Sequence, residues 1–396
     1  MQDNEKKPAL RFKGFTDPWE QRKFEEIAVR SSVMSDKKGL PRVEYEDIIS
    51  GAGRLNKDIK LKESEKVGIV FHKGDVLYGK LRPYLQNWLL ASFNGLAVGD
   101  FWVLQPQNTD SSFLYRLVQS QQFDGVANQS TGTKMPRADW KLVSKTKFAM
   151  PHSVDEQAAI GAYFEHLDTL ITLHQRKYEK LVNIKKSMLD KMFPKNGASV
   201  PEIRFKGFTD LWEQRKVGEL LTERNEQAPM SDEYPLMAFI ANEGVAPKGE
   251  RYDRSALVND TASKLYKKTK FGDFIYSSNN LETGSIGLNK YGKASVSPVY
   301  SIFKPTGIAD SDFLGRRLIR KDFINEMVKW RQGVIYGQWR IHESDFIKIE
   351  VTVPTVEEQY KLGLLLDNLD TLITLHQRKL EKLQNIKKSC LEKMFV

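Results

Sequence analysis

The most regular hydrophobic pattern in the chain lies in two long segments, 154–193 and 356–395. Apolar residues recur there in alternating steps of four and three, from Ile160 to Met192 and from Leu362 to Met394, and eight of the ten positions in each series are apolar. This average spacing of 3.5 residues predicts two helices that pair as a coiled coil. No proline interrupts either segment, so each helix should extend over about 40 residues, or roughly 60 Å.

The two polar positions fall at the same places in both series, a histidine followed by a lysine. His174 and His376 are expected to fix the register of the helix pair rather than to bind a metal ion. We expect the helices to pair antiparallel within one chain, because only a short linker, 194–203, joins the two halves. The residues expected at the pairing surface are Leu167, Ile171, His174, Leu181, Leu369, Ile373, His376 and Leu383.

Each helix also has a predicted start and a wider apolar surface than a two-helix seam needs. Ser153 with Glu156, and Thr355 with Glu358, have the spacing of a capping box, whose hydroxyl and carboxylate bind free backbone N–H groups. The wider surface would pack on the chain's own domains or on another subunit. Its side chains are Leu170, Leu173, Ile184, Leu372, Leu375 and Ile386.

Outside the long helices the pattern is mixed. Short apolar runs at 67–71 and 274–276 predict strands, with Gly- and Asn-rich turns between them. Residues 113–122 and 313–329 have apolar positions at helical spacing and predict one short helix each. We therefore expect a mixed α/β (α+β) chain in which two globular domains are separated by two long helices forming an antiparallel coiled coil.

The chain contains an internal repeat, which makes the two globular domains pseudo-repeats of one another. RFKGFTDPWEQRK at 11–23 and RFKGFTDLWEQRK at 204–216 differ only in Pro18 and Leu211. The helical segments 166–193 and 368–395 differ at five of 28 positions. We call these segments the repeated frame. The intervening regions, 24–150 and 217–353, diverge almost completely, so one function should be common to both halves and another should differ between them.

Composition and charge restrict the class of protein. The 396 residues carry a net charge of +10, with a pI of about 9.3, which fits a nucleic acid or another polyanion as partner. Cys390 is the single cysteine, which excludes an internal disulfide framework and a cysteine-rich zinc site. The polar start and the absence of a long uncharged apolar run predict no signal peptide and no membrane span. A cytoplasmic protein is expected.

The sequence offers little for catalysis. It has no methyltransferase motif for gripping an extruded adenine and no Gly-x-Gly-x-x-Gly that opens a βαβ unit. The segment 287–294 nearly matches a phosphate-binding P-loop, but Ala294 stands where Mg²⁺ binding needs a Ser or Thr. The six histidines are scattered, without a metalloprotease motif. We therefore expect no catalytic residue, no metal site and no cofactor bound by this chain.

Polar loops at matching places in the two divergent regions are better suited to binding DNA. Arg, Lys, Asn and Gln bind base edges, whereas Ser and Thr often bind phosphates. The candidate DNA-binding residues of the first half are Lys80, Arg82, Tyr84, Thr133, Lys134 and Arg137. Those of the second half are Ser277, Asn279, Asn280, Thr283, Arg331, Tyr336, Gln338 and Arg340. The run Asn-Ile-Lys-Lys at 183–186 and 385–388 is either a phosphate contact or a solvated helix face.

The two boxes, the Glu-Gln that opens each long helix, and the LDTLITLHQRK helix sequence resemble type I restriction–modification specificity (S) subunits over the whole chain. The resemblance implies two target-recognition domains that each recognise one half of a split double-stranded DNA site. It also implies two adenine-methylating modification subunits with S-adenosylmethionine, and restriction subunits that use ATP and Mg²⁺ to translocate and cut DNA. The implied segments are recognition domain 1–153, long helix 154–193, linker 194–203, recognition domain 204–355 and long helix 356–396.

Two other classes of function remain open from the sequence. A methyltransferase or nuclease that acts alone would modify or cut DNA as the purified chain. A coiled-coil scaffold independent of DNA would bind duplex DNA weakly and without sequence preference. The physical expectation favours the specificity subunit, because helices of roughly 60 Å are long enough to space two half-sites about one helical turn apart.

Overall fold

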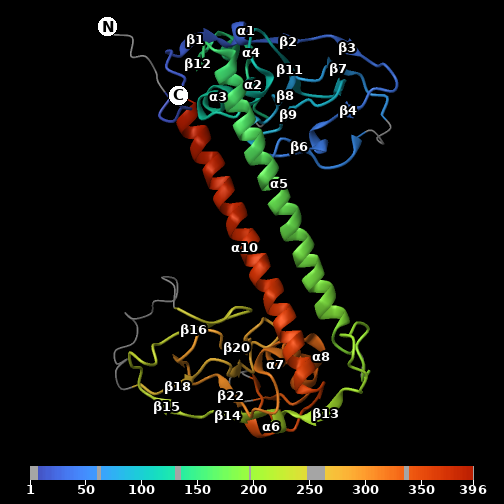
Figure 1. The fold of residues 1–396 in the computed structure, drawn as a ribbon, viewed down its shortest axis with the longest axis vertical. Coiled ribbons are helices and arrows are strands. Elements are labelled where there is room, and N and C mark those ends of the chain that lie inside the picture. The colour runs from blue at the N-terminus through green and yellow to red at the C-terminus, as the bar shows by residue number, and fades with distance from the viewer. Residues whose placement is uncertain are drawn as a thin grey trace. The chain divides into compact units, whose positions relative to one another are not determined.

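The computed structural model describes residues 8–59, 64–129, 135–195, 198–247, 264–333 and 339–395. The chain forms two compact units, and each combines one globular domain with a segment of both long helices (Figure 1). Unit 1 comprises 1–178 and 376–396, and unit 2 comprises 179–375. The long helices are α5 (Val154–Lys191) and α10 (Val356–Met394), which confirms the predicted bounds to within two residues. Each unit therefore contains part of both long helices, which were predicted from the sequence as segments separate from the domains.

The domain of unit 1 is built on two four-stranded sheets. One has the order β2-β11-β8-β9 and is antiparallel; the other, β3-β7-β10-β4, contains one parallel pair. The strands are β1 (Glu20–Lys23), β2 (Ala28–Ser31), β3 (Met34–Ser35), β4 (Arg42–Val43), β5 (Ile48–Ile49), β6 (Arg54–Leu55), β7 (Gly68–Phe71), β8 (Val76–Gly79), β9 (Trp88–Leu90), β10 (Gly95–Ala97), β11 (Phe101–Pro106) and β12 (Lys147–Met150). The helices are α1 (Phe24–Ile27), α2 (Ser111–Leu117), α3 (Gln121–Ala127) and α4 (Trp140–Lys145), with 3-10 turns η1 (Tyr45–Asp47) and η3 (Pro83–Leu85).

The domain of unit 2 repeats the principal sheet with a different sequence. Its order β14-β22-β19-β20 corresponds strand for strand to β2-β11-β8-β9. The strands are β13 (Glu213–Lys216), β14 (Leu221–Glu223), β15 (Gln227–Ala228), β16 (Ala238–Ile240), β17 (Gly244–Ala246), β18 (Tyr266–Thr269), β19 (Phe274–Tyr276), β20 (Ile286–Leu288), β21 (Ala294–Val296), β22 (Ser301–Pro305), β23 (Gln332–Gly333), β24 (Trp339–Arg340) and β25 (Glu350–Val353). The helices are α6 (Val217–Leu220), α7 (Ser311–Leu318), α8 (Lys321–Lys329) and α9 (Glu343–Phe346).

The predicted strands are present as β7 and β19, but the predicted short helices are wrong in one respect. Each of the two helical segments forms two helices, α2 and α3 in unit 1 and α7 and α8 in unit 2. In unit 1 the break falls at Ser120, whose hydroxyl accepts a hydrogen bond from the Phe123 N–H and starts α3. A side chain that caps a new helix stops the preceding one, because it offers the backbone a local alternative.

The repeated box and the Glu-Gln pair of the long helix bind each other in both units. Arg11 pairs with the buried Glu156 through Nε–Oε1 of 2.6 Å and Nη2–Oε2 of 2.7 Å, and Trp19 Nε1 donates to the same carboxylate at 3.2 Å. Arg204 and Glu358 repeat this bidentate pair in unit 2. The predicted capping box at Ser153 is thus only half correct. Ser153 Oγ accepts a hydrogen bond from the Glu156 N–H at 3.4 Å, but the Glu156 carboxylate binds Arg11 and Trp19 of the repeated segment 11–23.

The glutamine next to each of these glutamates ties the helix to the divergent domain. Gln157 Oε1 accepts from the Asp110 N–H at 2.9 Å, while its Nε2 donates to the Pro151 carbonyl. Gln359 makes the same two bonds in unit 2, to Asp310 and Pro354. Asp110 caps α2 through the Phe113 N–H, so the bond fixes the start of a domain helix on the long helix. The Glu-Gln motif therefore has one partner in the repeated frame and one in the variable region.

The end of each long helix completes the core of the other copy's domain. Met394 and Phe395 lie in the apolar core of unit 1, where the Phe395 ring stacks on Phe113 with centroids 5.5 Å apart. Met192 and Phe193 lie in the core of unit 2, and Phe193 stacks on Phe313 at 5.8 Å. The repeated Lys-Met-Phe sequence thus has the same role twice, each time in the domain encoded by the other half.

The contacts of the long helices confirm antiparallel pairing. In unit 1, Asp168 contacts Lys387 and His174 contacts His376, so residue numbers rise along α5 as they fall along α10. The pairing residues are all buried or half-buried, and Leu167, Leu369 and His376 are the most buried of the set. The wider apolar surface is not covered evenly, since Leu173, Leu372 and Leu375 are exposed by 42 to 56%.

His174 and His376 contact each other through their Nδ1 atoms at 2.8 Å, so one ring donates and the other accepts. Burial lowers the pKa of His376, and the charges of Lys177, His174 and Lys379 lower it further. A folded-state pKa below the ordinary value of about 6.5 means that the unfolded chain binds more protons. This contribution to stability is therefore present above about pH 6.5 and is lost as the pH falls through that value.

We expect urea unfolding to give a lower free energy of unfolding at pH 5.5 than at pH 7.5, because a protonated His376 carries a positive charge at a buried position close to Lys177 and Lys379. The double variant His174→Leu/His376→Leu places apolar residues at both seam positions and should lose this part of the pH dependence. The pH dependence of the free energy of unfolding is measured for the wild type and for the double variant. The difference between the two removes the contribution of the other titrating groups. If the free energy of unfolding depended on pH equally in the double variant and the wild type, the histidine pair would not contribute to this pH dependence.

Candidate nucleic-acid interface

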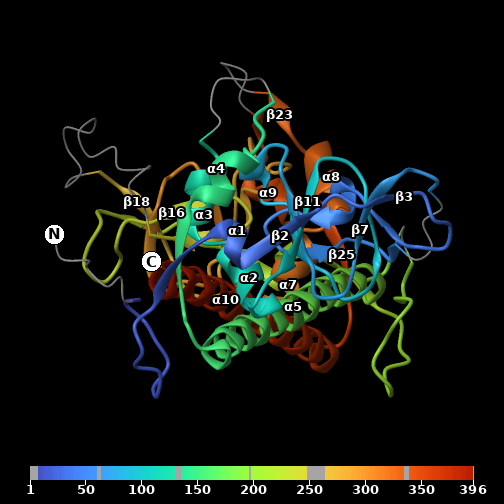
Figure 2. The same cartoon turned by 90° about the horizontal axis from the view of Figure 1, so that it is seen from above.

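The two polar loops predicted in the first half lie side by side in unit 1. The Arg82 N–H donates to the Pro136 carbonyl at 2.8 Å, and the Ala138 N–H donates to the Lys80 carbonyl at 2.8 Å. These bonds join the segment that leaves β8 to the segment that enters α4, although the two are more than 50 residues apart. In Figure 2, α4 lies away from the long helix α5, whereas α2 lies beside α5. Thr133 and Lys134 fall outside the described residues.

A single carboxylate binds two of the predicted cations. Asp100 lies 3.0 Å from Arg137 Nη2 and 3.5 Å from Lys80 Nζ. Burial acts to raise the pKa of Asp100, but the hydrogen bonds and charges of Arg137 and Lys80 outweigh it and hold that pKa below its ordinary value. Asp100 is therefore ionised at neutral pH and offsets part of the positive charge of Lys80 and Arg137. Neither residue is as available for a phosphate as its position in the sequence indicates.

Arg82 differs from its neighbours because it lies on a strained turn. Its φ of 49° is left-handed, as is the φ of 56° at Gln86, and these two residues flank the 3-10 turn η3. A left-handed conformation costs a residue with a Cβ roughly 1–2 kcal/mol. The Gly51 N–H, which donates to the Gln86 carbonyl at 3.1 Å, and the Ser50 hydroxyl, which donates to the Leu85 carbonyl, hold the turn. Arg82 and Tyr84 are exposed on it.

The loops predicted in the second half also meet. The Trp339 N–H donates to Asn279 Oδ1 at 2.5 Å, and the Ile341 N–H donates to Ser278 Oγ at 3.0 Å. Arg331 Nε donates to the Ser278 carbonyl at 3.1 Å. The segment that follows β19 is therefore held against the segment around β23 and β24, as the equivalent segments are in unit 1. Tyr336 and Gln338 lie outside the described residues.

The burial of these side chains divides the predicted set in unit 2. Ser277 is buried, and the Arg331 guanidinium is 10% exposed in a bidentate pair with Glu282, so neither faces solvent. Arg340 has a side chain that is 56% exposed, with Glu343 3.6 Å away. Asn279, Asn280 and Thr283 are also exposed; Thr283 donates its hydroxyl to the Asn280 carbonyl at 3.1 Å.

Trp339 is a further candidate contact, which was not predicted from the sequence. It is 50% exposed beside Arg340, and Tyr84 is likewise exposed on the polar loop that follows β8 in unit 1. Aromatic side chains can stack on nucleic-acid bases, so an exposed ring within a polar loop is suited to contact DNA. The signal in the sequence is a tryptophan inside a polar, glycine-containing loop. It is easily mistaken for a core residue.

A metal site and a phosphate-binding loop are two further kinds of site that can be compared with the described residues. No group of three or more His, Cys, Asp or Glu side chains that could hold a metal ion occurs among them. The P-loop-like segment connects strands β20 and β21, so no helix N-terminus follows it to bind a phosphate. Within the part of the chain that the structure covers, no helix is apolar over a length that would cross a membrane.

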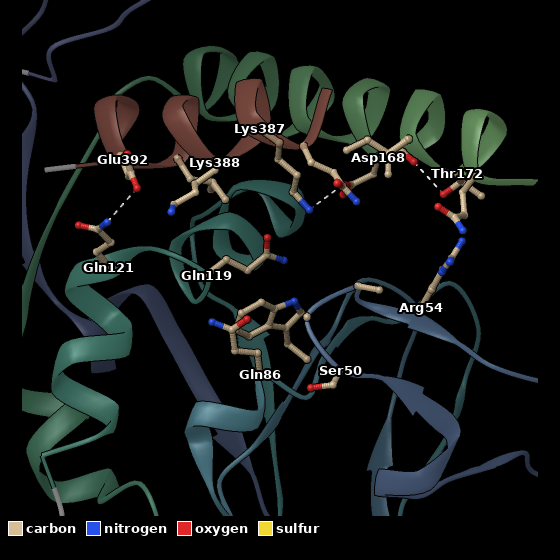
Figure 3. Close-up of a pocket in the computed structure, with 17 residues that line it drawn as sticks. Ser50, Arg54, Gln86, Gln119, Gln121, Asp168, Thr172, Lys387, Lys388 and Glu392 are labelled. Atoms are coloured by element: carbon tan, nitrogen blue, oxygen red, sulfur yellow. Dashed lines mark hydrogen bonds and ion pairs between the residues drawn. The ribbon is translucent and has the colours of Figure 1, made fainter. Parts of the chain in front are cut away.

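Unit 1 also contains a cleft of about 640 Å³ between the domain and the long helices (Figure 3). Arg54, Gln86 and Gln119 line it from the domain. On the helix side, Lys387 Nζ lies 2.7 Å from Asp168 Oδ1, so the positive charge of that wall is compensated. The mixed charge makes this cleft a weaker candidate than the exposed loops for the DNA backbone. Because Lys387 binds Asp168 of the other long helix, one lysine of the Asn-Ile-Lys-Lys run is a helix-pairing residue.

The comparisons with known proteins agree on one family. The family model described as the type I restriction modification DNA specificity domain matches residues 16–183 and 209–385. The chain is 25% identical over 127 residues to the type I restriction enzyme EcoDI specificity subunit of Escherichia coli, a match that covers 31% of this chain and 28% of that protein. It is 22% identical over 284 residues to the MjaVIII specificity subunit of Methanocaldococcus jannaschii, over 66% of this chain and 64% of that protein.

The matched segments thus span less than two thirds of the length of either curated relative. Among solved structures, the S subunit of a type I restriction–modification system from M. genitalium has the same fold, with a TM-score of 0.60 at 14% identity and coverage of 99% of both chains. Because the family model matches most of both halves, the chain belongs to the type I restriction modification DNA specificity domain family.

Proposed function

We propose that the chain is the DNA specificity subunit of a type I restriction–modification complex and recognises a split DNA site with one domain for each half. The observation that carries this proposal is the duplicated pair of contact loops. In both units the segment after β8 or β19 is joined by hydrogen bonds to a second polar segment, although the two domains have different sequences. One architecture with two different sets of exposed side chains suits two different half-sites.

The exposed side chains are those that recognition of duplex DNA requires. Arg82 and Arg340 have the bidentate geometry for guanine, and Asn280 has that for adenine. Tyr84 and Trp339 add aromatic surfaces next to these polar groups. Lys80 and Arg137 share Asp100, and Arg331 is bound to Glu282, so these cations position the loops more than they supply charge.

The proposal assigns catalysis to partner subunits. Two modification subunits with S-adenosylmethionine would methylate adenines, and restriction subunits would use ATP and Mg²⁺ to translocate and cut DNA. The nearly identical sequences of the repeated frame suit two copies of the same partner, one for each half. Methylation and cleavage of genomic DNA would take place in the cytoplasm, where the chain is therefore proposed to act. The chain itself would contribute recognition and geometry, without a catalytic group.

The decisive experiment is to co-express the chain with the modification subunits encoded beside it and to map methylated adenines in the host genome. We expect one split motif with a fixed number of unspecified bases between its halves. Methylation by the purified chain alone would instead support a stand-alone methyltransferase. Association with its partners without any sequence preference on duplex DNA would support a scaffold.

Alanine substitutions test the contact loops. Arg82→Ala should cost about 1–3 kcal/mol of DNA binding by the assembled methyltransferase and relax one position in one half of the motif. Asn280→Ala and Arg340→Ala should relax positions in the other half only. Binding to duplexes with single base changes measures both effects. Lys304→Ala, which removes an exposed cation from β22, is the matched control. Full affinity and an unchanged motif in all three variants would refute the assignment of the loops.

A further inference from the structure

Each long helix carries an aspartate that lies between an arginine of the globular domain and a lysine of the other long helix. In unit 1, Asp168 Oδ2 lies 2.8 Å from Arg116 Nη1, and its Oδ1 lies 2.7 Å from Lys387 Nζ. Figure 3 shows the contact of Lys387 and Asp168 at the wall of the cleft. We call this arrangement the Arg–Asp–Lys bridge.

Unit 2 contains the same bridge. Asp370 Oδ2 lies 3.0 Å from Arg316 Nη2, and Asp370 also pairs with Lys185. Asp168 and Asp370 occupy the same place in the repeated sequence Leu-Asp-Thr-Leu, and Lys185 and Lys387 occupy the same place in Asn-Ile-Lys-Lys. The lysine that interrupts the apolar seam is thus the partner of an aspartate from the other copy, which explains why both copies have it.

The arginine side chains of the bridges are shielded from solvent, whereas Asp168 and Asp370 are 29 and 38% exposed. The Arg116 side chain is 4% exposed and Arg316 is 12% exposed, and Arg116 lies over the rings of Tyr115 and Phe164 at 4.7 and 5.6 Å. An ion pair with one buried partner is screened less than a surface pair. Removal of Asp168 takes the acidic partner from the buried Arg116, whereas Arg316 would keep its second partner Asp367. The geometry of the arginine is therefore well determined by its contacts.

The two arginines belong to the divergent regions, where little else is shared. Arg116 ends the sequence Ser-Ser-Phe-Leu-Tyr-Arg in α2, and Arg316 ends Ser-Asp-Phe-Leu-Gly-Arg in α7. The phenylalanine and leucine of each sequence lie in the apolar core, which accounts for their recurrence. Packing in the apolar core does not explain why an arginine recurs in both sequences. Its recurrence follows instead from its contact with the repeated frame.

The bridge attaches each domain to its long helix at a second place along that helix. The first is at the helix start, where Glu156 binds Arg11 and Gln157 binds the Asp110 N–H. Asp168 follows Glu156 by twelve residues, or roughly 18 Å at 1.5 Å per residue. A domain held at one point can tilt about that point, whereas two attachments this far apart fix its angle to the helix.

We propose that Arg116 and Arg316 are positioning residues that set the angle of each recognition domain on the long helices, and thereby the number of base pairs allowed between the two half-sites. This inference rests on the proposed function. The residues contact no DNA base and act through the placement of the loops that do. A relaxed angle moves the contact loops along the DNA axis, so a complex without the bridge accepts neighbouring spacer lengths.

The test uses the assembled methyltransferase and duplexes that carry its mapped motif with the native spacer, or with one base pair added or removed. Asp168→Asn keeps the size of the side chain and removes the charge that both cations share. We expect the ratio of affinities for the native and altered spacers to fall by a factor of about 5 to 10, which corresponds to about 1–1.4 kcal/mol, the net contribution of one ordinary hydrogen bond. Asp168→Glu should restore most of the ratio, and Lys387→Met should lower it in the same direction.

Lys388→Met is the matched control, because Lys388 is exposed and adjacent to Lys387. Thermal melting of every complex separates a change in stability from a change in spacer preference. A lower melting temperature with an unchanged ratio in both Asp168→Asn and Lys387→Met would show that the bridge only stabilises the fold, and would overturn the inference. A wild-type complex without sequence preference would instead refute the proposed function itself.

Discussion

A chain whose residues 24–150 are replaced by the equivalent segment of another family member should direct methylation to a motif with one new half. The other half and the spacer should stay the same. This is the largest change in activity that we expect from any alteration of the chain, because it exchanges every contact loop of unit 1 and leaves the repeated frame intact. Mapping of methylated adenines, with the wild-type motif as reference, measures the result.

The structure defines what a grafted segment must contain. It needs a residue in the place of Asp110, whose N–H binds Gln157, and an arginine in the place of Arg116, which binds Asp168. The reciprocal graft of 217–353 is the matched control and should change only the other half of the motif. A wholly new motif, or a changed spacer in a graft that keeps both residues, would contradict the independence of the two domains.

The substitution Glu156→Gln should lower the free energy of unfolding by about 3 kcal/mol, because it leaves the Arg11 guanidinium without its counter-charge at a mostly buried site. The amide can still accept one hydrogen bond from Arg11 or Trp19, but it cannot accept all the bonds that the carboxylate accepts now. The loss should appear in urea or guanidinium unfolding at neutral pH, monitored by tryptophan fluorescence.

Glu358→Gln should destabilise unit 2 to a similar extent, because Arg204 makes the same bidentate contact there. Glu165→Gln is the control, since Glu165 is exposed on the same helix and its neutralisation should change stability by less than about 0.5 kcal/mol. If Glu156→Gln behaved like Glu165→Gln, the contact between box and helix would have little energetic weight.

The long helices were predictable because their signal is local and sustained. Seam residues such as Leu167 and Leu369 recur every three or four positions, and the absence of proline leaves the pattern uninterrupted. The paired histidines were also predictable, since a polar residue at the same seam position of both copies indicates a register contact. The short helices were harder: Ser120 both follows one helix and caps the next, and an apolar period alone does not reveal such a cap.

The contacts of the candidate site could be predicted only in part. The sequence places Lys80, Arg82 and Arg137 in polar loops, but the pairing of two of them with Asp100 depends on residues that are far apart in the chain. The same holds for Arg331, which Glu282 binds. Lys185 and Lys387 are exceptions in the apolar pattern until their aspartate partners from the other copy are known. Long-range ion pairs leave no mark in a local pattern.

The exchange of helix ends between the two copies affects the order in which the molecule is completed during synthesis. Domains of multidomain proteins generally fold from the N-terminus onward as the ribosome produces them. Here the core of the first domain needs Met394 and Phe395, which are made after the whole second domain. The second domain receives Met192 and Phe193 from a segment that is already available when its own strands emerge. The domain translated second can therefore finish its core first, while the earlier one remains open until the last turns of α10 leave the ribosome.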